Sequence, residues 1–114
     1  MNDRFSVNIS GDDRATMLTL TGELDLASSE QLEEALARVR DWGTALVVLD
    51  LRELTFMDST GLHLLVEANQ RAREGGPQFQ VISGGPQVQR LLSITGVDRW
   101  LTLIDAPDQP LRAS

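Results

Sequence analysis

The amino-acid sequence predicts a single α/β domain in which helices pack on a mixed β-sheet of about five strands, in the order β-β-α-β-α-β-α-β. Three observations lead to this prediction. Residues 45–51 are almost continuously apolar, which is typical of a strand covered on both faces in a partly parallel sheet. Two segments nearer the amino terminus alternate apolar and polar residues, as half-buried strands do. Beyond them, helical and strand patterns follow one another in turn.

One domain is expected to span residues 1–114, because a chain of 114 residues is typical of a single domain. Its core should cover about residues 5–104. The tail, residues 106–114, contains two of the four prolines and is expected to be flexible.

Five segments have strand patterns, either alternating or rich in apolar residues. They are residues 5–9, 18–21, 45–51, 79–83 and 100–104. The turn-forming cluster at residues 10–13 predicts a hairpin between the first two. After the third strand we expect a loop that ends at Phe56 and Met57.

Three segments repeat apolar residues at helical spacing and have recognisable ends. Their predicted first residues are Ser28, Asp58 or Ser59, and Pro86, and their ends lie near Gly43, Gly75 and Gly96. A serine followed three residues later by Gln31 fits a capping box at the first helix.

The charge balance is acidic, with 17 Asp and Glu against 10 basic residues, all Arg, and a net charge of −7. Such a surface repels phosphate backbones and anionic lipids, so we expect neither nucleic-acid nor membrane partners. Without Lys, a P-loop or a Schiff base cannot form. The absence of Cys excludes disulfides and thiolate chemistry and, with no signal-peptide or membrane-span pattern, favours a cytoplasmic protein.

Few residues suit catalysis, since the chain has one His and no Cys. His63 lies off the apolar stripe of its helix, which favours a solvated position over a catalytic one. Carboxylates could serve in acid–base chemistry or hold a divalent ion, although solvated loop acids are the simpler interpretation. The carboxylates considered are Asp25, Asp50, Glu53 and Asp58. We therefore expect no enzyme, no metal site and no cofactor.

The segment from Phe56 to Leu62 has more specific physics, because it leads from a strand into a helix. Asp58 or Ser59 can accept hydrogen bonds from the first backbone N–H groups of that helix. A hydroxyl here would lie near the carboxyl end of the sheet, where open α/β folds place their sites. A phosphate on it would meet free N–H groups and the positive end of the helix dipole. An ordinary N-cap is the alternative interpretation.

This same segment, Phe56–Leu62, resembles the phosphorylation loop of the anti-sigma factor antagonists, which are bacterial members of the STAS domain family. A second signature, Leu20–Asp25, precedes the first helix, and Pro86–Leu92 with Thr95-Gly96 resembles the third helix and its end. The likeness spans about residues 15–104 in the right order and spacing. It implies a single STAS-like domain.

The resemblance also implies a mechanism. Members of this family are regulators rather than enzymes. The unphosphorylated antagonist binds an anti-sigma factor, itself a serine/threonine kinase, and the sigma factor is freed for transcription in a stress or sporulation response. Phosphorylation ends the binding, and a PP2C-type phosphatase restores it. By motif position the acceptor is Ser59, with Thr60 as runner-up.

The partner surface that the resemblance implies combines one residue of the second signature with the helix start. Its residues are Asp25, Asp58, Ser59, Thr60, Gly61 and Leu62. Nearby apolar side chains, Leu24, Leu26 and Met57, fit either the core or a docking surface, and the pattern leaves both open. We expect a monomer or a weak dimer.

Two other functions remain to be weighed. The first is a constitutive STAS adaptor in a larger signalling or lipid-transport complex, which would need no phosphorylation. The second is a nucleotide hydrolase, which the missing Lys and the absence of a phosphate-binding motif disfavour.

Overall fold

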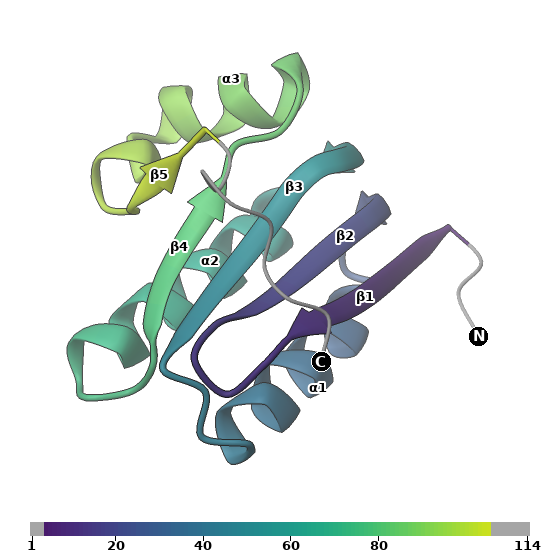
Figure 1. Cartoon of the computed structure of the whole chain (residues 1–114). Helices are drawn as coiled ribbons and strands as arrows, with labels where there is room; N and C mark the ends of the chain where they lie inside the picture. Colours follow the sequence, from purple (N-terminus) through teal and green to yellow (C-terminus); the bar gives the residue numbers. More distant parts are fainter. Residues whose placement is uncertain (1–3, 106–114) are drawn as a thin grey trace.

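Five strands form one mixed sheet in the order β1-β2-β3-β4-β5 in the computed structural model, which describes residues 4–105 (Figure 1). β1 runs antiparallel to β2, and all other neighbours are parallel. The strands are β1 (Phe5–Gly11), β2 (Thr16–Leu24), β3 (Leu46–Met57), β4 (Gln78–Ile82) and β5 (Leu103–Ile104). The helices are α1 (Ser29–Asp41), α2 (Ser59–Arg73) and α3 (Pro86–Thr95), followed by a 3₁₀ turn, η1 (Val97–Arg99).

The predicted fold class and element order are confirmed, whereas the expected flexible tail, 106–114, lies outside the described residues. α1 and α2 lie on one side of the sheet, and α3 lies beyond the end of β3 (Figure 1). The hydrophobic core fills the space between the sheet and the helices. It combines alternate residues of β3 with the apolar stripes of the helices, chiefly Val47, Leu49, Leu51, Leu32, Leu36, Leu65, Val88 and Leu92.

The hairpin between β1 and β2 closes through a tight turn, as its sequence predicts. Asp12 Oδ1 accepts hydrogen bonds from the backbone N–H groups of Arg14 and Ala15, at 2.9 and 3.2 Å. Gly11 has a φ of +113°, and a Cβ there would collide with the Ala15 carbonyl oxygen. Glycine is therefore required at this turn.

The parallel strands β2 and β3 are longer than predicted. β3 has 12 residues and continues to Met57, so the loop expected before Met57 is wrong. Two register shifts, between Thr19 and Thr21 and between Gly22 and Glu23, let β2 remain paired with β3 as far as Leu24. Such bulges break the regular alternation by which a strand is detected.

The carboxyl-terminal strand is shorter than predicted. Residues 97–99 form η1, and β5 contains only Leu103 and Ile104. Trp100 therefore lies outside the sheet, although it was placed in the strand at 100–104. None of the helices within residues 4–105 combines the length and apolarity needed to span a bilayer.

The helix ends follow the glycines, but the predicted capping box is wrong. Gly43, Gly75 and Gly96 have positive φ angles of 76°, 97° and 77°, as helix-terminating glycines do. Ser28 is the N-cap of α1, yet its side chain makes no capping bond. The Oε1 atom of Gln31 is buried without a partner among the described residues.

Asp50 is buried within β3 rather than solvated in a loop, which corrects the interpretation made from sequence. The residue is only 3% exposed, and its carboxylate accepts hydrogen bonds from Arg52 Nε and Nη2, at 3.0 and 2.8 Å. Burial alone would raise the pKa of this carboxyl, but the hydrogen bonds and charge of Arg52 outweigh it. The pKa of Asp50 therefore lies below its ordinary value of 3.8.

This pair predicts a pH-dependent contribution to stability. A carboxyl with a lowered pKa stabilises the fold above its unfolded-state pKa, and that contribution is lost as the pH falls through the folded-state pKa. Asp50→Asn should lower the free energy of unfolding at pH 7 by about 1–3 kcal/mol, the cost of losing hydrogen bonds to a charged group. Its stability should also change less than that of the wild type below about pH 4.

Urea unfolding at pH 7 and at acid pH measures both effects. Glu53→Gln is the control, because Glu53 is an exposed neighbour on the same strand. Equal losses in the two variants would show that the hydrogen bonds between the buried Asp50 carboxylate and Arg52 do not set the stability difference.

Candidate functional site

Helix α2 starts directly after β3, and its N-cap is Asp58. The Oδ1 atom of Asp58 accepts hydrogen bonds from the N–H groups of Thr60 and Gly61, at 2.9 and 3.4 Å. Asp58 also accepts the first helical bond, from Leu62 N–H to its carbonyl oxygen, at 3.1 Å. Of the two candidate caps, the structure therefore selects Asp58.

Ser59 occupies the first helical position and is exposed, whereas Thr60 is half-buried. Neither hydroxyl takes part in a hydrogen bond within the described residues. The side chain of Ser59 is thus available to another molecule.

The cap occupies part of the donor set that a phosphate was expected to meet at this helix start, while the N–H of Ser59 has no hydrogen bond within residues 4–105. Asp58 already binds the N–H groups of Thr60 and Gly61. A phosphate on Ser59 would therefore lie close to the Asp58 carboxylate and would find fewer vacant donors than an uncapped helix offers. It would add about −1.5 to −2 charges beside an existing anion.

The end of β2 lies against this helix start. The N–H of Asp58 donates to the carbonyl oxygen of Leu24 at 3.2 Å, and Leu24 pairs with Met57 in the sheet. A Cβ at Gly61 would lie 2.8 Å from the side chains of both Leu24 and Met57. The absence of a side chain at Gly61 therefore lets α2 approach the two strands, which joins the two sequence signatures in space.

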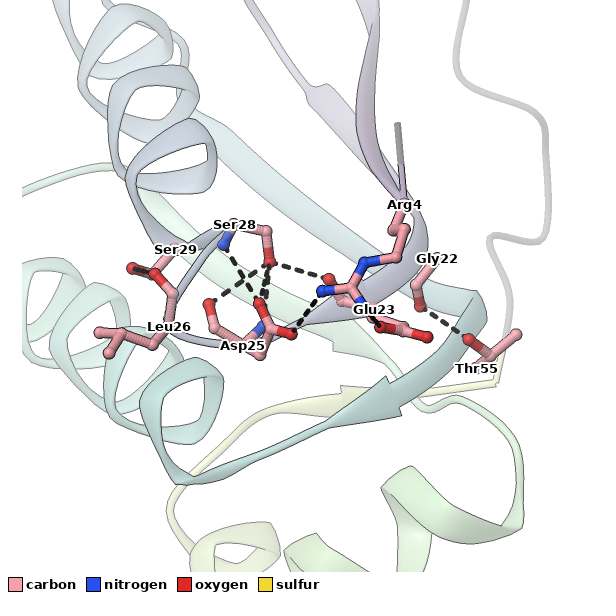
Figure 2. Close-up of polar contacts among 8 residues, drawn as sticks. All are labelled: Arg4, Gly22, Glu23, Asp25, Leu26, Ser28, Ser29 and Thr55. Atoms are coloured by element: carbon pink, nitrogen blue, oxygen red, sulfur yellow. Dashed lines mark hydrogen bonds and ion pairs between the residues drawn. The ribbon is translucent and has the colours of Figure 1, made fainter. Parts of the chain in front are cut away.

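The loop from β2 to α1 is held by its own polar groups (Figure 2). Ser28 Oγ accepts from the N–H of Asp25 at 2.9 Å and donates to the carbonyl oxygen of Glu23 at 2.8 Å. In return, Asp25 Oδ1 accepts from the N–H of Ser28 at 3.2 Å. This reciprocal bonding replaces the expected capping box and fixes the loop's shape.

The carboxylate of Asp25 is therefore already engaged in holding the fold. Besides Ser28, it faces the guanidinium of Arg4, whose Nη2 lies 3.7 Å from Asp25 Oδ2 (Figure 2). The Nη1 atom of Arg4 also lies 3.2 Å from Glu23 Oε1. A role for Asp25 in binding a partner remains a prediction, while its role in shaping this loop follows from these contacts.

The three apolar residues that fitted either the core or a docking surface are now assigned. Leu24 and Met57 are fully buried, whereas Leu26 is 77% exposed. The side chain of Leu26 points away from the polar cluster of the loop (Figure 2). Gly61 and Leu62 are buried, so they shape the surface from beneath.

Gln87 supports the same site and was missed in the sequence. Its Oε1 accepts from Met57 N–H and its Nε2 donates to the Met57 carbonyl oxygen, both at 3.0 Å. The first turn of α3 is thereby fastened to the residue before Asp58. No local pattern signals a bond between residues 30 positions apart.

The polar side chains around the helix start are exposed or half-buried. His63, expected to be solvated, is exposed on α2, and its Nε2 atom lies 3.4 Å from Glu67 Oε1. Within residues 4–105, no three or more acidic or imidazole side chains gather so that they could hold a metal ion. An exposed hydroxyl next to the Asp58 carboxylate, with an exposed leucine on the adjoining β2–α1 loop, suits contact with another protein.

The fold defines a small α/β domain in which two sequence signatures meet at the β3–α2 junction. The model of the STAS domain family matches residues 6–109, and the chain belongs to that family. The resemblance drawn from the sequence signatures is thereby confirmed.

Relatives of this chain share one type of name. The anti-sigma-B factor antagonist of Staphylococcus aureus (strain NCTC 8325 / PS 47) is 28% identical over 93 residues, which cover 82% of this chain and 86% of that protein. An anti-sigma factor antagonist from Mycobacterium paratuberculosis has a solved structure with a TM-score of 0.81 and 24% identity, covering 95% of this chain and 92% of the other. The solved structure of SpoIIAA, a Bacillus cell fate determinant, in its phosphorylated form has a TM-score of 0.68 and 20% identity. The match covers 91% of this chain and 92% of that chain.

The cap at Asp58 generates a prediction on stability. Asp58→Ala should lower the free energy of unfolding by about 0.5–2 kcal/mol, because two N–H groups lose their acceptor. Asp58→Asn keeps an oxygen at the same place and should retain most of the stability. Urea unfolding of both variants measures this, and an Asn variant as unstable as the Ala variant would contradict the capping role.

Proposed function

We propose that this protein is an anti-sigma factor antagonist that works by partner switching. Its unphosphorylated form binds an anti-sigma factor that is also a serine/threonine kinase, and the sigma factor is released. The kinase phosphorylates Ser59 and the complex dissociates, after which a PP2C-type phosphatase restores the binding form. The names of the relatives and the geometry of the β3–α2 junction support this proposal.

The observation that carries the proposal is the exposed hydroxyl of Ser59 at the first position of α2, which makes no hydrogen bond to any residue from 4 to 105. The helix start that carries it is tied to the end of β2 by the bond from Asp58 N–H to the Leu24 carbonyl oxygen, two residues before the exposed Leu26. A partner that docks on this surface would bring its own groups against the hydroxyl. A kinase partner would therefore find its acceptor within the docking surface.

Charge explains how phosphate would end the binding. The phosphate and the Asp58 carboxylate would both have to lose water or face repulsion in the complex. A loss of about 2–4 kcal/mol weakens binding roughly 30- to 1,000-fold. The change needs no refolding, because the phosphate is added to an exposed position.

Ser59 is preferred over Thr60 as the acceptor. Thr60 is half-buried, and a β-branched side chain at a helix start has fewer rotamers with which to reach a kinase. Its N–H is also bonded to Asp58.

The remaining parts of the proposal concern setting and class. We infer a non-enzymatic regulator in a bacterial cytoplasm, acting as a monomer or weak dimer without a cofactor. The surface of net charge −7 suits a protein partner with a basic docking face rather than nucleic acid or a membrane.

Phosphate mapping tests the acceptor. Purified protein is incubated with ATP in a lysate of the source organism and recovered, and the tryptic peptide from Glu53 to Arg71 is weighed by mass spectrometry. We expect one added phosphate on the wild type and none on Ser59→Ala.

Ser59→Ala carries the control within the same peptide, because Thr60 remains available in it. Phosphate on Thr60 in both proteins would reverse the assignment. No phosphate on either, in a lysate with active kinases of this type, would instead favour the constitutive adaptor.

Leu26 provides a test of the docking surface. Leu26→Ser should slow phosphorylation of Ser59 several-fold in the same lysate, because an exposed leucine beside the acceptor is lost to the partner. It should change the free energy of unfolding by no more than about 0.5 kcal/mol, as exposed substitutions do. Trp42→Ser is the matched control, since Trp42 is also exposed but lies at the far end of α1. Equal slowing in both variants would contradict a specific role for the Leu26 loop.

A further inference from the structure

The edge of the sheet beside β4 is only partly covered. β5 pairs with Val81 and Ile82 alone, so the first part of β4, from Gln78 to Gln80, has no neighbouring strand on that side among residues 4–105. Figure 1 shows β5 beside the upper end of β4 and nothing from the described strands below it.

Phe79, although only 6% exposed as a whole residue, directs its backbone N–H and C=O groups toward this edge. In a parallel pair, successive residues direct their N–H and C=O groups to opposite neighbours. Gln78 N–H bonds Ala45 on the β3 side, and Val81 N–H bonds the carbonyl oxygen of Thr102 on the β5 side, both at 2.9 Å. Phe79 therefore faces the same side as Val81. Within residues 4–105, no backbone group bonds to Phe79 on that side.

An open cavity of about 380 Å³ adjoins this edge. Its walls come from the second half of α2, from β4 and from the segment after η1. The polar side chains that line it are Asn69, Arg73, Gln78, Gln80 and Thr102, with the indole of Trp100. The edge thus has a recess in which a neighbouring side chain could lie.

Arg73 and Trp100 form a defined pair in this recess. The Arg73 guanidinium lies 5.8 Å from the centre of the Trp100 ring, and Asn69 Nδ2 donates to the Trp100 carbonyl oxygen at 2.8 Å. Trp100 is nevertheless 61% exposed. A half-open indole with a guanidinium on its face is a common element of protein-binding surfaces.

The charge of this recess is opposite to that of the chain as a whole. Arg73 is the one formally charged side chain among the described residues that line it, and the chain has a net charge of −7. Glu74 lies next in sequence, and its carboxylate accepts a bond from Gln70 Nε2 at 3.4 Å. More distant acidic groups are screened beyond a Debye length of about 8 Å.

We propose that the open edge of β4 binds an extended segment of a partner protein that carries an acidic side chain. The backbone of that segment pairs with the N–H and C=O groups of Phe79, as an added strand does. Its carboxylate meets Arg73, and its neighbouring side chains contact Trp100. Arg73 lies 14 residues beyond Ser59 on α2, roughly 20 Å along the helix axis, so this surface is distinct from the phosphorylation site.

NMR of the full ¹⁵N-labelled chain tests the proposal with synthetic peptides. The probe is acetyl-Thr-Glu-Val-Glu-Thr-amide, compared with a form in which Lys replaces both Glu and with a form N-methylated along its backbone. We expect the acidic peptide to shift the Phe79 amide and the Trp100 indole signals in proportion to its concentration. The lysine form should shift them less, and the N-methylated form should leave the Phe79 amide unchanged.

Three results would overturn the proposal. Phe79 could show no shift with any peptide. It could respond equally to the N-methylated form, which would exclude strand addition. It could shift with protein concentration alone, which would assign the edge to a second copy of this chain.

Arg73→Gln tests the choice of an acidic segment. This variant should bind the acidic peptide about fivefold more weakly, the usual effect of losing one partly exposed ion pair. Arg90→Gln, at an exposed arginine on α3, is the matched control and should bind as the wild type does. Unchanged affinity in Arg73→Gln would overturn the acidic assignment.

Discussion

The parallel pairing of β2 with β3 is the interaction on which the site depends. Two register shifts keep the strands together until Leu24 faces Met57, and the next residue, Asp58, donates its N–H to Leu24. Without this continued pairing, the β2–α1 loop and the start of α2 would diverge. The missing side chain at Gly61 then allows the helix to close against both strands. An exposed serine is thus presented from a rigid, well-packed base.

Much of the fold could be predicted because its signals are local. A nearly continuous apolar run marks β3, and glycines at Gly43, Gly75 and Gly96 end the helices. The same local reasoning missed the second half of β3, because its bulged pairing with β2 exposes Arg52 and Glu53 in succession and hides the strand period. It also shortened β2 and lengthened β5.

The candidate site could be located but not resolved from sequence. The pattern of a helix start indicated a cap at Asp58 or Ser59 without choosing between them. The two hydrogen bonds between Gln87 and Met57 depend on a distant segment of the chain. Ser28 fits the capping-box pattern, yet Glu23 and Asp25 provide competing partners for its hydroxyl. Such competition is decided by the three-dimensional arrangement, which a spacing rule does not contain.

The reciprocal bonds between Asp25 and Ser28 have a consequence for the thermodynamics of recognition. A loop that is already ordered loses little conformational entropy when a partner arrives, since that loss occurs when the chain folds. The exposed Leu26 is therefore displayed in a preorganised position. Contacts made through it should appear in the binding free energy almost undiminished, and association should proceed without a slow ordering step.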